Sequence, residues 1–410
     1  MDFVPFSGGL VLFGGNAPLV TNETWSYDGT TWTQLTPPTS PSGRFGAQLV
    51  HDSARNVAVL YGGLTSNLSM LPASYETWEW NGVTWALATS VANAGPRYRY
   101  GACFDSLRGR VVMYGGQSTQ AAGTLNSQTW EYDGTTWTEV ATIGNPGRRD
   151  RPAMCFHAGI GMTVMFGGHD GLALTDETWL YEGFSGTWFQ AALAVPKPSP
   201  RNAAALVYDP LHNLCILMGG QGANVLSDTW VFDGTRWTQQ ATTTQPGRDH
   251  MMAFLPTNGQ VVRFGGFVAA PSTLSNQTWE LGTGTYGAGC AGTNGVPALA
   301  SAGAMTLGQP WTVNATNLNP TFSLAFLVLG FTPLPGIDLT LLLNMPGCAA
   351  YVSPDLLLGI AGAGGAASWT WPAVAGPIGA ALYTQALCFD PPANGFGFTV
   401  SNAVYATIGN

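Results

Sequence analysis

Short apolar runs that end in a Gly-Gly pair recur at nearly constant intervals through the first two thirds of the chain. The pairs are separated by 48, 53, 52, 52 and 46 residues and begin at Gly14, Gly62, Gly115, Gly167, Gly219 and Gly265. After each pair, a polar loop leads to a Thr-Trp run, whose tryptophans are Trp25, Trp78, Trp130, Trp179, Trp230 and Trp279. A second aromatic follows seven residues later, or nine in the fourth unit, at Trp32, Trp85, Trp137, Trp188, Trp237 and Tyr286. Such a fixed period predicts an array of similar structural units.

Each unit predicts four short strands: one after an arginine, one ending at Gly-Gly, one starting at Thr-Trp and one around the second aromatic. The arginines introduce units two to six and are Arg44, Arg97, Arg149, Arg201 and Arg248, while MDFVPF supplies the first strand of unit one. Asp-Gly or Asn-Gly, which accept positive φ at low cost, predict a tight turn between the last two strands at Asp28, Asn81, Asp133 and Asp233. The 54 glycines and the small share of charged residues, 9%, agree with many short strands and little helix.

This order of a double glycine, Thr-Trp and a second aromatic resembles the kelch repeat, and six copies cover residues 1–287. The resemblance implies a six-bladed β-propeller with blades at about 1–35, 44–88, 97–140, 149–191, 201–240 and 248–287. A lone four-stranded sheet cannot bury both faces, so six sheets are expected to stand radially and shield one another until the ring closes. The repeated tryptophans are therefore expected to pack between blades rather than to form a sugar-binding stripe. The sixth unit departs from the pattern, because it ends in Tyr286 after a glycine-rich segment without the Asp-Gly turn.

A second domain is predicted at 288–410, where the repeat stops and no Lys, Arg or His occurs. Apolar or alternating runs parted by Gly- and Pro-rich turns predict a β-sandwich there. They include WTVNAT, FSLAFLVLGF, AASWTWPAV, GAALYTQALCF and GFTVSNAVYATIG. With its opening YGAGCAG and its later GCAAYVSP, the segment resembles the C-terminal domain that recurs in large secreted proteins of planctomycete-like bacteria. The fold class expected for the whole chain is thus all-β, a propeller followed by a sandwich.

The net charge of −9 argues against nucleic acid or an anionic membrane as a partner, because no basic surface can release counterions from phosphates. No apolar run of eighteen residues is present, so no membrane span is expected. The N-terminal MDFVPFSGG has an acid at position 2 and lacks a basic region, so it is not expected to be a signal peptide.

The six cysteines divide between the two predicted domains. Cys103 and Cys155 stand twelve residues before their Gly pairs, where other units carry Val50 and Val207, and Cys215 stands where other units carry Ala58 and Val111. These three are expected to be small core residues. In the second domain, Cys290 and Cys348 are the pair expected to form a disulfide, which would fit an oxidising compartment. None of the cysteine spacings suits a zinc site, and no metal is expected.

Candidate ligand-binding residues are the polar side chains that break the regularity of the repeat. In a propeller of this strand order, the loops after Gly-Gly and the segments with the repeated arginines lie at one mouth of the central channel. Irregular positions on a repeat scaffold are where function is expected. The candidates at this mouth are Arg99, Gln117, Asp150, Arg151, His169, Asp170, Gln221, Asp249 and His250.

The five repeated arginines favour a structural role. Each belongs to a unit that has an acid or amide directly before Thr-Trp, at Glu76, Gln128, Glu177, Asp228 and Gln277. Bonds from a partly buried guanidinium to these groups would repeat around the ring. The alternative is a ring of guanidinium groups that binds an acidic glycan or peptide.

Catalytic signatures are absent from the sequence. It contains no His-Glu-x-x-His, no Gly-x-Ser-x-Gly, no phosphate loop and no dinucleotide fingerprint. The kelch fold also occurs in galactose oxidase, but no motif here matches its copper site of two His and two Tyr with a Tyr-Cys crosslink. Neither a catalytic residue nor a cofactor is therefore assigned. The pair Asp150 and Asp249 leaves glycoside chemistry open as an alternative.

The function expected from the sequence is a non-enzymatic binding or adhesion protein outside a bacterial cell, whose propeller mouth recognises carbohydrate or peptide. The second domain is expected to serve as an attachment or spacer module. One alternative is a structural subunit that self-associates into a fibre or surface layer, since low charge weakens the electrostatic barrier to association. A glycan-active enzyme with its site at the mouth is the other alternative.

Overall fold

A computed structural model places residues 1–410. It describes all of them except 17–18, 67–72, 90–93, 120–124, 194, 241–246, 258, 269–272, 282–284, 287–296, 303–309, 322–323, 331–332, 339–348, 353–355, 372–380, 394–397 and 408–410. Two compact units are present. The first comprises Met1–Asp209, Leu214–Pro256 and Val261–Trp279, and the second comprises Pro210–Asn213, Thr257–Gln260 and Glu280–Asn410. In the part of the chain that is described, no helix has the length and apolar character needed to cross a membrane.

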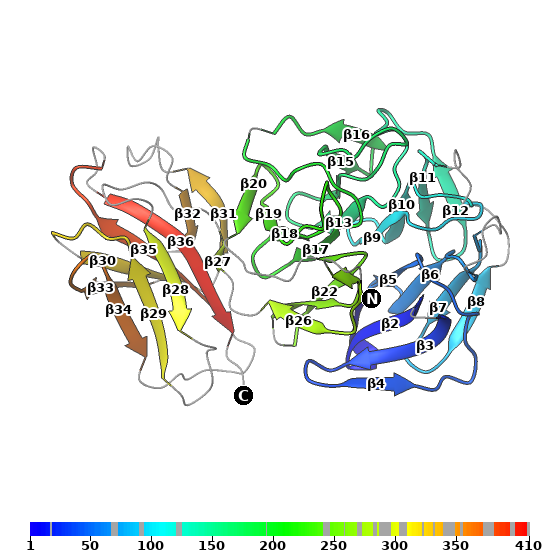
Figure 1. Cartoon of the computed structure of the whole chain (residues 1–410), viewed down its shortest axis with the longest axis horizontal. Coiled ribbons are helices and arrows are strands. Elements are labelled where there is room, and N and C mark those ends of the chain that lie inside the picture. Colours follow the sequence, from blue (N-terminus) through cyan, green and yellow to red (C-terminus); the bar gives the residue numbers. More distant parts are fainter. Residues whose placement is uncertain are drawn as a thin grey trace. The chain divides into compact units, whose positions relative to one another are not determined.

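The first unit is built from small antiparallel sheets that stand around a common centre (Figure 1). The first sheet contains β1 (Asp2–Val4), β2 (Gly9–Asn16), β3 (Val20–Tyr27) and β4 (Trp32–Leu35), with the short 3-10 helix η1 (Pro5–Ser7) after β1. The second contains β5 (Gln48–Asp52), β6 (Val57–Tyr61), β7 (Thr77–Trp80) and β8 (Trp85–Thr89). The third contains β9 (Gly101–Asp105), β10 (Arg110–Tyr114), β11 (Thr129–Tyr132) and β12 (Trp137–Val140).

The remaining sheets continue the series. The fourth contains β13 (Ala153–His157), β14 (Met162–Phe166), β15 (Thr178–Glu182) and β16 (Thr187–Gln190). The fifth contains β17 (Ala205–Asp209), β18 (Leu214–Met218), β19 (Thr229–Phe232) and β20 (Trp237–Gln240). The sixth contains β22 (Met251–Leu255), β23 (Gln260–Phe264) and β26 (Thr278–Leu281). These repeated antiparallel sheets confirm the prediction of an all-β propeller.

The ring closes through its innermost strands. β1, β5, β9, β13, β17 and β22 each contact the next in this order, and β22 contacts β1. A cluster of apolar side chains seals this last interface, with Leu10 and Leu12 of the first sheet against Leu255 and Val262 of the sixth. The first and last sheets therefore bury each other's apolar faces as the internal neighbours do.

The second aromatic of each of the first five repeats packs across a blade interface. Each ring meets the residue that stands before the Gly pair of the preceding blade, at centroid distances of 4.7 to 5.3 Å: Trp32 on Phe264, Trp85 on Phe13, Trp137 on Tyr61, Trp188 on Tyr114 and Trp237 on Phe166. Each indole Nε1 also donates to the threonine of the Thr-Trp run in the preceding blade. For Trp32, Trp85, Trp137, Trp188 and Trp237 in turn, the acceptors are Thr278, Thr24, Thr77, Thr129 and Thr178. Five indoles thus make the same two contacts, which explains why the repeat requires an aromatic donor at this position.

The first aromatics are less buried than the sequence predicts. Trp230 is buried, but Trp279 is 37% exposed and the other four lie partly in solvent. Their indoles bond locally, for example from Trp78 to Glu76 at 3.0 Å and from Trp230 to Asp228 at 2.7 Å. Packing between blades therefore falls mainly to the second aromatic, which is the more buried ring and contacts the neighbouring sheet in the first five repeats.

The sixth blade lacks the fourth strand predicted around Tyr286. That residue belongs to β27 (Thr285–Tyr286), which pairs with β36 (Phe398–Thr407) of the second compact unit rather than with the sixth blade. The Asp-Gly or Asn-Gly turn that returns the chain in four of the other repeats is missing from the sequence before β27. Consequently, among the described residues, no indole donates at the interface between the fifth and sixth blades, and the buried Thr229 Oγ1 has no hydrogen-bond partner there.

This orphaned hydroxyl leads to a stability prediction. Thr229→Val removes a buried, unpaired oxygen without changing the side-chain shape, so we expect it to raise the free energy of unfolding by about 1 kcal/mol. Thr178→Val is the matched control, because it removes the acceptor of Trp237 and should lower the free energy of unfolding by about 1 kcal/mol. Urea unfolding of the two variants measures both changes. Equal destabilisation by both would contradict the assignment.

The second unit is also formed by antiparallel strands. One sheet has the order β27, β36, β35 (Ala381–Phe389), β30 (Leu324–Gly330) and β33 (Leu356–Ala361). Another contains β28 (Ala298–Ala302), β29 (Trp311–Thr316) and β34 (Ala367–Trp371), and a third pairs β31 (Pro333–Asp338) with β32 (Ala349–Val352). One apolar cluster joins the first two sheets, with Trp311 and Val313 against Leu327 and Leu329. Classification of this unit as a β-sandwich stays a prediction, as does the domain boundary at residue 287, which lies outside the described residues.

Cysteine positions are known for four of the six. Cys103, Cys155, Cys215 and Cys388 are buried, in agreement with the expected core role of the first three. Cys290 and Cys348 lie outside the described residues, so their predicted disulfide stays a prediction.

Candidate functional site

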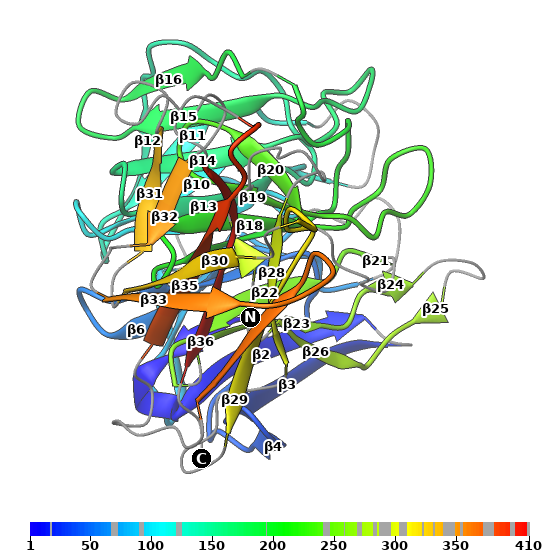
Figure 2. The same ribbon diagram turned by 90° about the vertical axis from the view of Figure 1, so that its left-hand side faces the viewer.

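The residue after each repeated arginine pairs with the residue after the Gly pair, at one end of the blades. The bridged pairs are Phe45 with Leu64, Tyr98 with Gln117, Asp150 with His169, and Asn202 with Gln221. In the sixth unit the same pairing links Arg248 with Phe267 and grows into a sheet of β21 (Gly247–Arg248), β24 (Phe267–Val268) and β25 (Thr273–Leu274), visible in Figure 2. The two sets of segments therefore meet at one mouth of the ring, as the strand order predicts.

A chain of backbone hydrogen bonds runs from blade to blade around this mouth. The amides of Arg99, Arg151, Ala203 and Asp249 donate to the carbonyls of Gly46, Arg99, Arg151 and Ala203, over 2.7, 2.8, 3.2 and 2.9 Å. We call these five residues, Gly46, Arg99, Arg151, Ala203 and Asp249, the mouth ring. They hold the same place in successive blades and all have a left-handed backbone, with φ between 51° and 68°. Four of the five are not glycine, although a side chain at positive φ is disfavoured.

Buried arginines fix the base of the mouth ring. Arg44 and Arg201 each donate to the carbonyl of the first glycine of their own Gly pair at 3.0 Å and to the acid before Thr-Trp, Glu76 or Asp228. Arg97 makes the same bonds, to Gly115 O at 3.0 Å and to the amide of Gln128 at 2.8 Å, and Arg149 pairs with Glu177. Their own carbonyls accept from the second glycine of the preceding blade's Gly pair. The predicted structural role is confirmed for these four arginines.

For the fifth arginine the predicted pairing is wrong. Arg248 bonds Asp249 at 2.7 Å instead of Gln277, and its guanidinium lies 4.5 Å over the ring of Phe267. The four confirmed arginines stand 18 residues before their Gly pairs, whereas Arg248 stands 17 before Gly265, so Gly247 takes the equivalent place. Gly247 indeed accepts the Gly220 amide at 2.8 Å, and a guanidinium from Arg263 reaches the space where a Cβ of residue 247 would lie.

Opposite charges gather on the side of the mouth formed by the third, fourth and sixth blades. Asp249 accepts from Arg248 at 2.7 Å, and its other oxygen lies 3.4 Å from Nε of Arg151. Arg99 lies 5.0 Å over the ring of Tyr98, and burial together with the charge of Arg151 lowers its pKa. Three guanidinium groups, those of Arg99, Arg151 and Arg248, thus lie near two carboxyl groups, those of Asp249 and Asp150. The mouth therefore has an excess of positive charge.

Asp150 is the least exposed acid of this group, at 8%. Burial raises its pKa, against the charges of Arg151 and Arg99, which act to lower it. Its Oδ1 has no hydrogen-bond partner among the described residues. A buried carboxyl with an unused acceptor is costly for the folded protein unless another group, such as a water or a ligand, supplies the donor.

A comparison with known protein families agrees with this geometry. Residues 68–266 match the family model described as the KLHDC2/KLHL20/DRC7 Kelch-repeats domain. This segment fits a kelch-repeat domain. It spans the last two strands of the second blade (β7 and β8) through the second strand of the sixth, and therefore includes every non-glycine residue of the mouth ring. Kelch repeats indicate a role in protein–protein interaction.

Three of the predicted ligand residues, His169, Asp170 and His250, either bond within their own turn or are buried, so they are poorly placed to contact a ligand at the mouth. Asp170 accepts the amides of Leu172 and Ala173 at 2.7 Å, and the ring of His169 accepts the amide of Gly171 at 3.0 Å, so both stabilise their own turn. His250 is 6% exposed and lies against Gly219, and burial lowers its pKa to about 3, which keeps it neutral. Whether any of the nine candidates binds a ligand stays a prediction.

Of the other predicted residues, Arg99, Gln117, Arg151 and Gln221 are partly exposed, Asp249 is exposed and Asp150 is buried. Gln117 accepts from the hydroxyl of Tyr98 at 2.5 Å, and the amide of Gln221 donates to Gly222 O at 2.9 Å. Three further polar residues of the kelch mouth were missed from the sequence, namely Tyr98, Asn202 and Arg248. Tyr98 and Asn202 hold the same repeat position as Asp150, so alignment of the units would have found them. In the described residues, no group of three or more His, Cys, Asp or Glu side chains is arranged to hold a metal ion.

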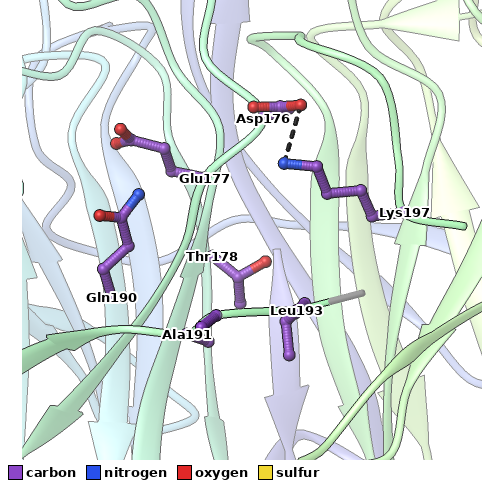
Figure 3. Close-up of a pocket in the computed structure, with 8 residues that line it drawn as sticks. Asp176, Glu177, Thr178, Gln190, Ala191, Leu193 and Lys197 are labelled. Atoms are coloured by element: carbon purple, nitrogen blue, oxygen red, sulfur yellow. Dashed lines mark ion pairs between the residues drawn. The ribbon is translucent and has the colours of Figure 1, made fainter. Parts of the chain in front are cut away.

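A separate pocket of about 330 Å³ lies at the side of the kelch domain, between the fourth blade and the segment that leads to the fifth. Figure 3 shows Lys197 reaching toward Asp176, with an ion pair of 2.9 Å, while Glu177 and Gln190 line the other side. Glu177 is already bonded to Arg149 and Trp179. The three charged side chains of this pocket thus already have partners, which makes it a weaker candidate than the mouth.

Proposed function

We propose that the protein is a non-enzymatic binding or adhesion protein that acts outside the cell, and that the mouth ring recognises a carboxylate-bearing peptide or carbohydrate. The observation that carries this proposal is the left-handed backbone of Arg99, Arg151, Ala203 and Asp249. Gly46 shows that the hydrogen-bonded ring forms with glycine at this place. Side chains at the other positions cost conformational energy, and such outliers cluster at ligand-binding sites.

The charges of the mouth favour an anionic group in the ligand. Arg99 and Arg151 stand on adjacent blades, and each positive charge disfavours the other. A carboxylate between them would relieve this repulsion through charge-assisted hydrogen bonds. Asp249 pairs with Arg151 and Arg248, and the negative charges of Asp150 and Asp249 would discriminate against ligands with several negative charges. The likeness of 288–410 to domains of secreted bacterial proteins supports the extracellular location.

Peptide and glycan arrays test the proposal. The wild-type protein should bind acidic members of one array, and Arg99→Gln with Arg151→Gln should weaken that binding by about 10-fold or more, as expected for lost charge-assisted bonds. Arg236→Gln is the matched control, because Arg236 lies at the Asp233 turn, at the opposite end of its blade. Equal signals from the wild type and the double variant would remove the mouth from consideration.

A glycan-active enzyme is the second candidate, because Asp150 combines a raised pKa with a nearby Asp249 charge. A general acid needs such a raised pKa, and a second carboxylate could serve as base or nucleophile. The glycans that bind on the array decide between the two: product formation that Asp150→Asn abolishes supports the enzyme, and stable binding without product supports the binding protein.

A further inference from the structure

Cys155 and Cys215 meet inside the interface between the fourth and fifth blades. Cys155 is the third residue of β13, Cys215 is the second residue of β18, and their sulfur atoms are 2.9 Å apart. Both are buried, at 6% and 0% exposure, and they belong to one apolar cluster with Phe166 and Leu217. The sulfurs must approach by only about 0.9 Å to reach the length of a disulfide bond.

The equivalent places at other blade interfaces show which side chains are enough to pack the positions of Cys155 and Cys215. At the interface of the third and fourth blades, the same two places hold Cys103 and Thr163, with Sγ and Oγ1 3.5 Å apart. At the interface of the second and third blades, they hold Val50 and Val111, which share a cluster. A pair of small side chains therefore suffices for packing. Packing alone therefore does not require a cysteine at both places of one interface.

We propose that Cys155 and Cys215 form a disulfide that links the fourth blade to the fifth. In the reaction, one thiolate attacks a small-molecule disulfide such as oxidised glutathione and releases one glutathione thiol. The other cysteine then attacks the mixed disulfide, forms the Cys155–Cys215 bond and releases the second glutathione thiol. Two protein thiols are oxidised, one glutathione disulfide is reduced to two thiols, and the two protein protons end on these thiols.

The bond must close before the blades pack. Burial raises the pKa of the Cys155 thiol well above its ordinary value, so the attacking thiolate is scarce in the folded protein. An unfolded or partly folded chain exposes both thiols and allows the exchange. Because the cysteines are 60 positions apart, the link restricts the unfolded chain and should raise the midpoint of thermal unfolding by on the order of 5–10 °C.

Refolding with a defined thiol-disulfide buffer tests the proposal on the full chain. The reduced, denatured protein is refolded with oxidised and reduced glutathione, the remaining thiols are blocked, and the unreduced protein is digested and analysed by mass spectrometry. We expect a linked peptide pair that contains Cys155 and Cys215, about 2 Da lighter than the two thiol peptides together. Recovery of both cysteines as blocked thiols would overturn the proposal.

Matched variants connect the bond to stability. Cys155→Val should remove both the linked peptide and the difference in unfolding midpoint between oxidised and reduced protein, since valine fills this place in other blades. Cys103→Val, at the equivalent place of the third blade, should retain both. Loss of the linked peptide in Cys103→Val would show a different pairing and contradict the proposal. The peptide map of the wild type decides the question even if a variant folds poorly.

Discussion

Replacing Trp85 by alanine should lower the free energy of unfolding by about 3–5 kcal/mol, the cost of removing a large buried ring. The side chain is 1% exposed and lies between the first and second blades. Its ring meets Phe13 at 4.9 Å and Trp80 at 5.4 Å, and its Nε1 donates to Thr24 at 3.0 Å. Urea unfolding followed by far-UV circular dichroism measures the change.

Two further substitutions separate packing from hydrogen bonding. Trp85→Phe keeps much of the ring but loses the bond to Thr24, so we expect a smaller loss of about 1–2 kcal/mol. Trp279→Ala removes a side chain that is 37% exposed and should cost less than Trp85→Ala. Equal costs at the two tryptophans would mean that the second aromatics do not hold the blades together.

Replacing Asp228 by alanine should also lower the free energy of unfolding by about 3–5 kcal/mol, because it leaves the charge of Arg201 buried and unpaired. The Arg201 side chain is fully buried and reaches both oxygens of Asp228, at 2.6 and 2.8 Å. Asp228→Asn should cost less, since the amide of Gln128 serves Arg97 at the equivalent place. If Asp228→Ala unfolds at the same urea concentration as the wild type, the arginine does not depend on this acid.

The same pair predicts a dependence of stability on pH. Burial acts to raise the pKa of Asp228, but hydrogen bonds from Arg201 and Trp230 and the charge of Arg201 outweigh it, so the pKa lies below its ordinary 3.8. A depressed pKa in the folded state means that the stabilisation is present above the unfolded pKa and is lost as the pH falls through the folded pKa. The difference in unfolding free energy between wild type and Asp228→Asn should therefore shrink between pH 5 and about pH 3.

Much of the propeller can be predicted from the sequence, because its period is carried by residues whose roles are local. Gly-Gly, Thr-Trp and the second aromatic mark strand ends and interface contacts, and these repeat with the blade. The sixth repeat departs from this pattern. Its arginine stands one residue closer to the Gly pair than in the other repeats, so Arg248 lies at the mouth and bonds Asp249. The strand that contains Tyr286 pairs with β36 instead of the sixth sheet.

The candidate site was predictable in position but not in detail. Counting from the Gly pairs places Arg99, Arg151 and Asp249 at one mouth, yet the sequence does not show their left-handed backbone or the hydrogen bonds that join them. These arise from contacts between blades, which depend on the closed ring. The proximity of Cys155 and Cys215 has the same origin, since their positions in two different repeats coincide only after the blades pack.

The closed ring is the claim on which the mouth depends, and a double-mutant cycle at its seam tests it most directly. Trp32→Phe and Thr278→Val are combined, because Nε1 of Trp32 donates to Thr278 at 2.7 Å across the junction of the first and sixth blades. The account predicts a coupling energy of about 0.5–1.5 kcal/mol, similar to that of the internal pair Trp137 and Thr77. Additive effects at the seam, together with clear coupling at the internal pair, would show that the sheets do not close into a ring.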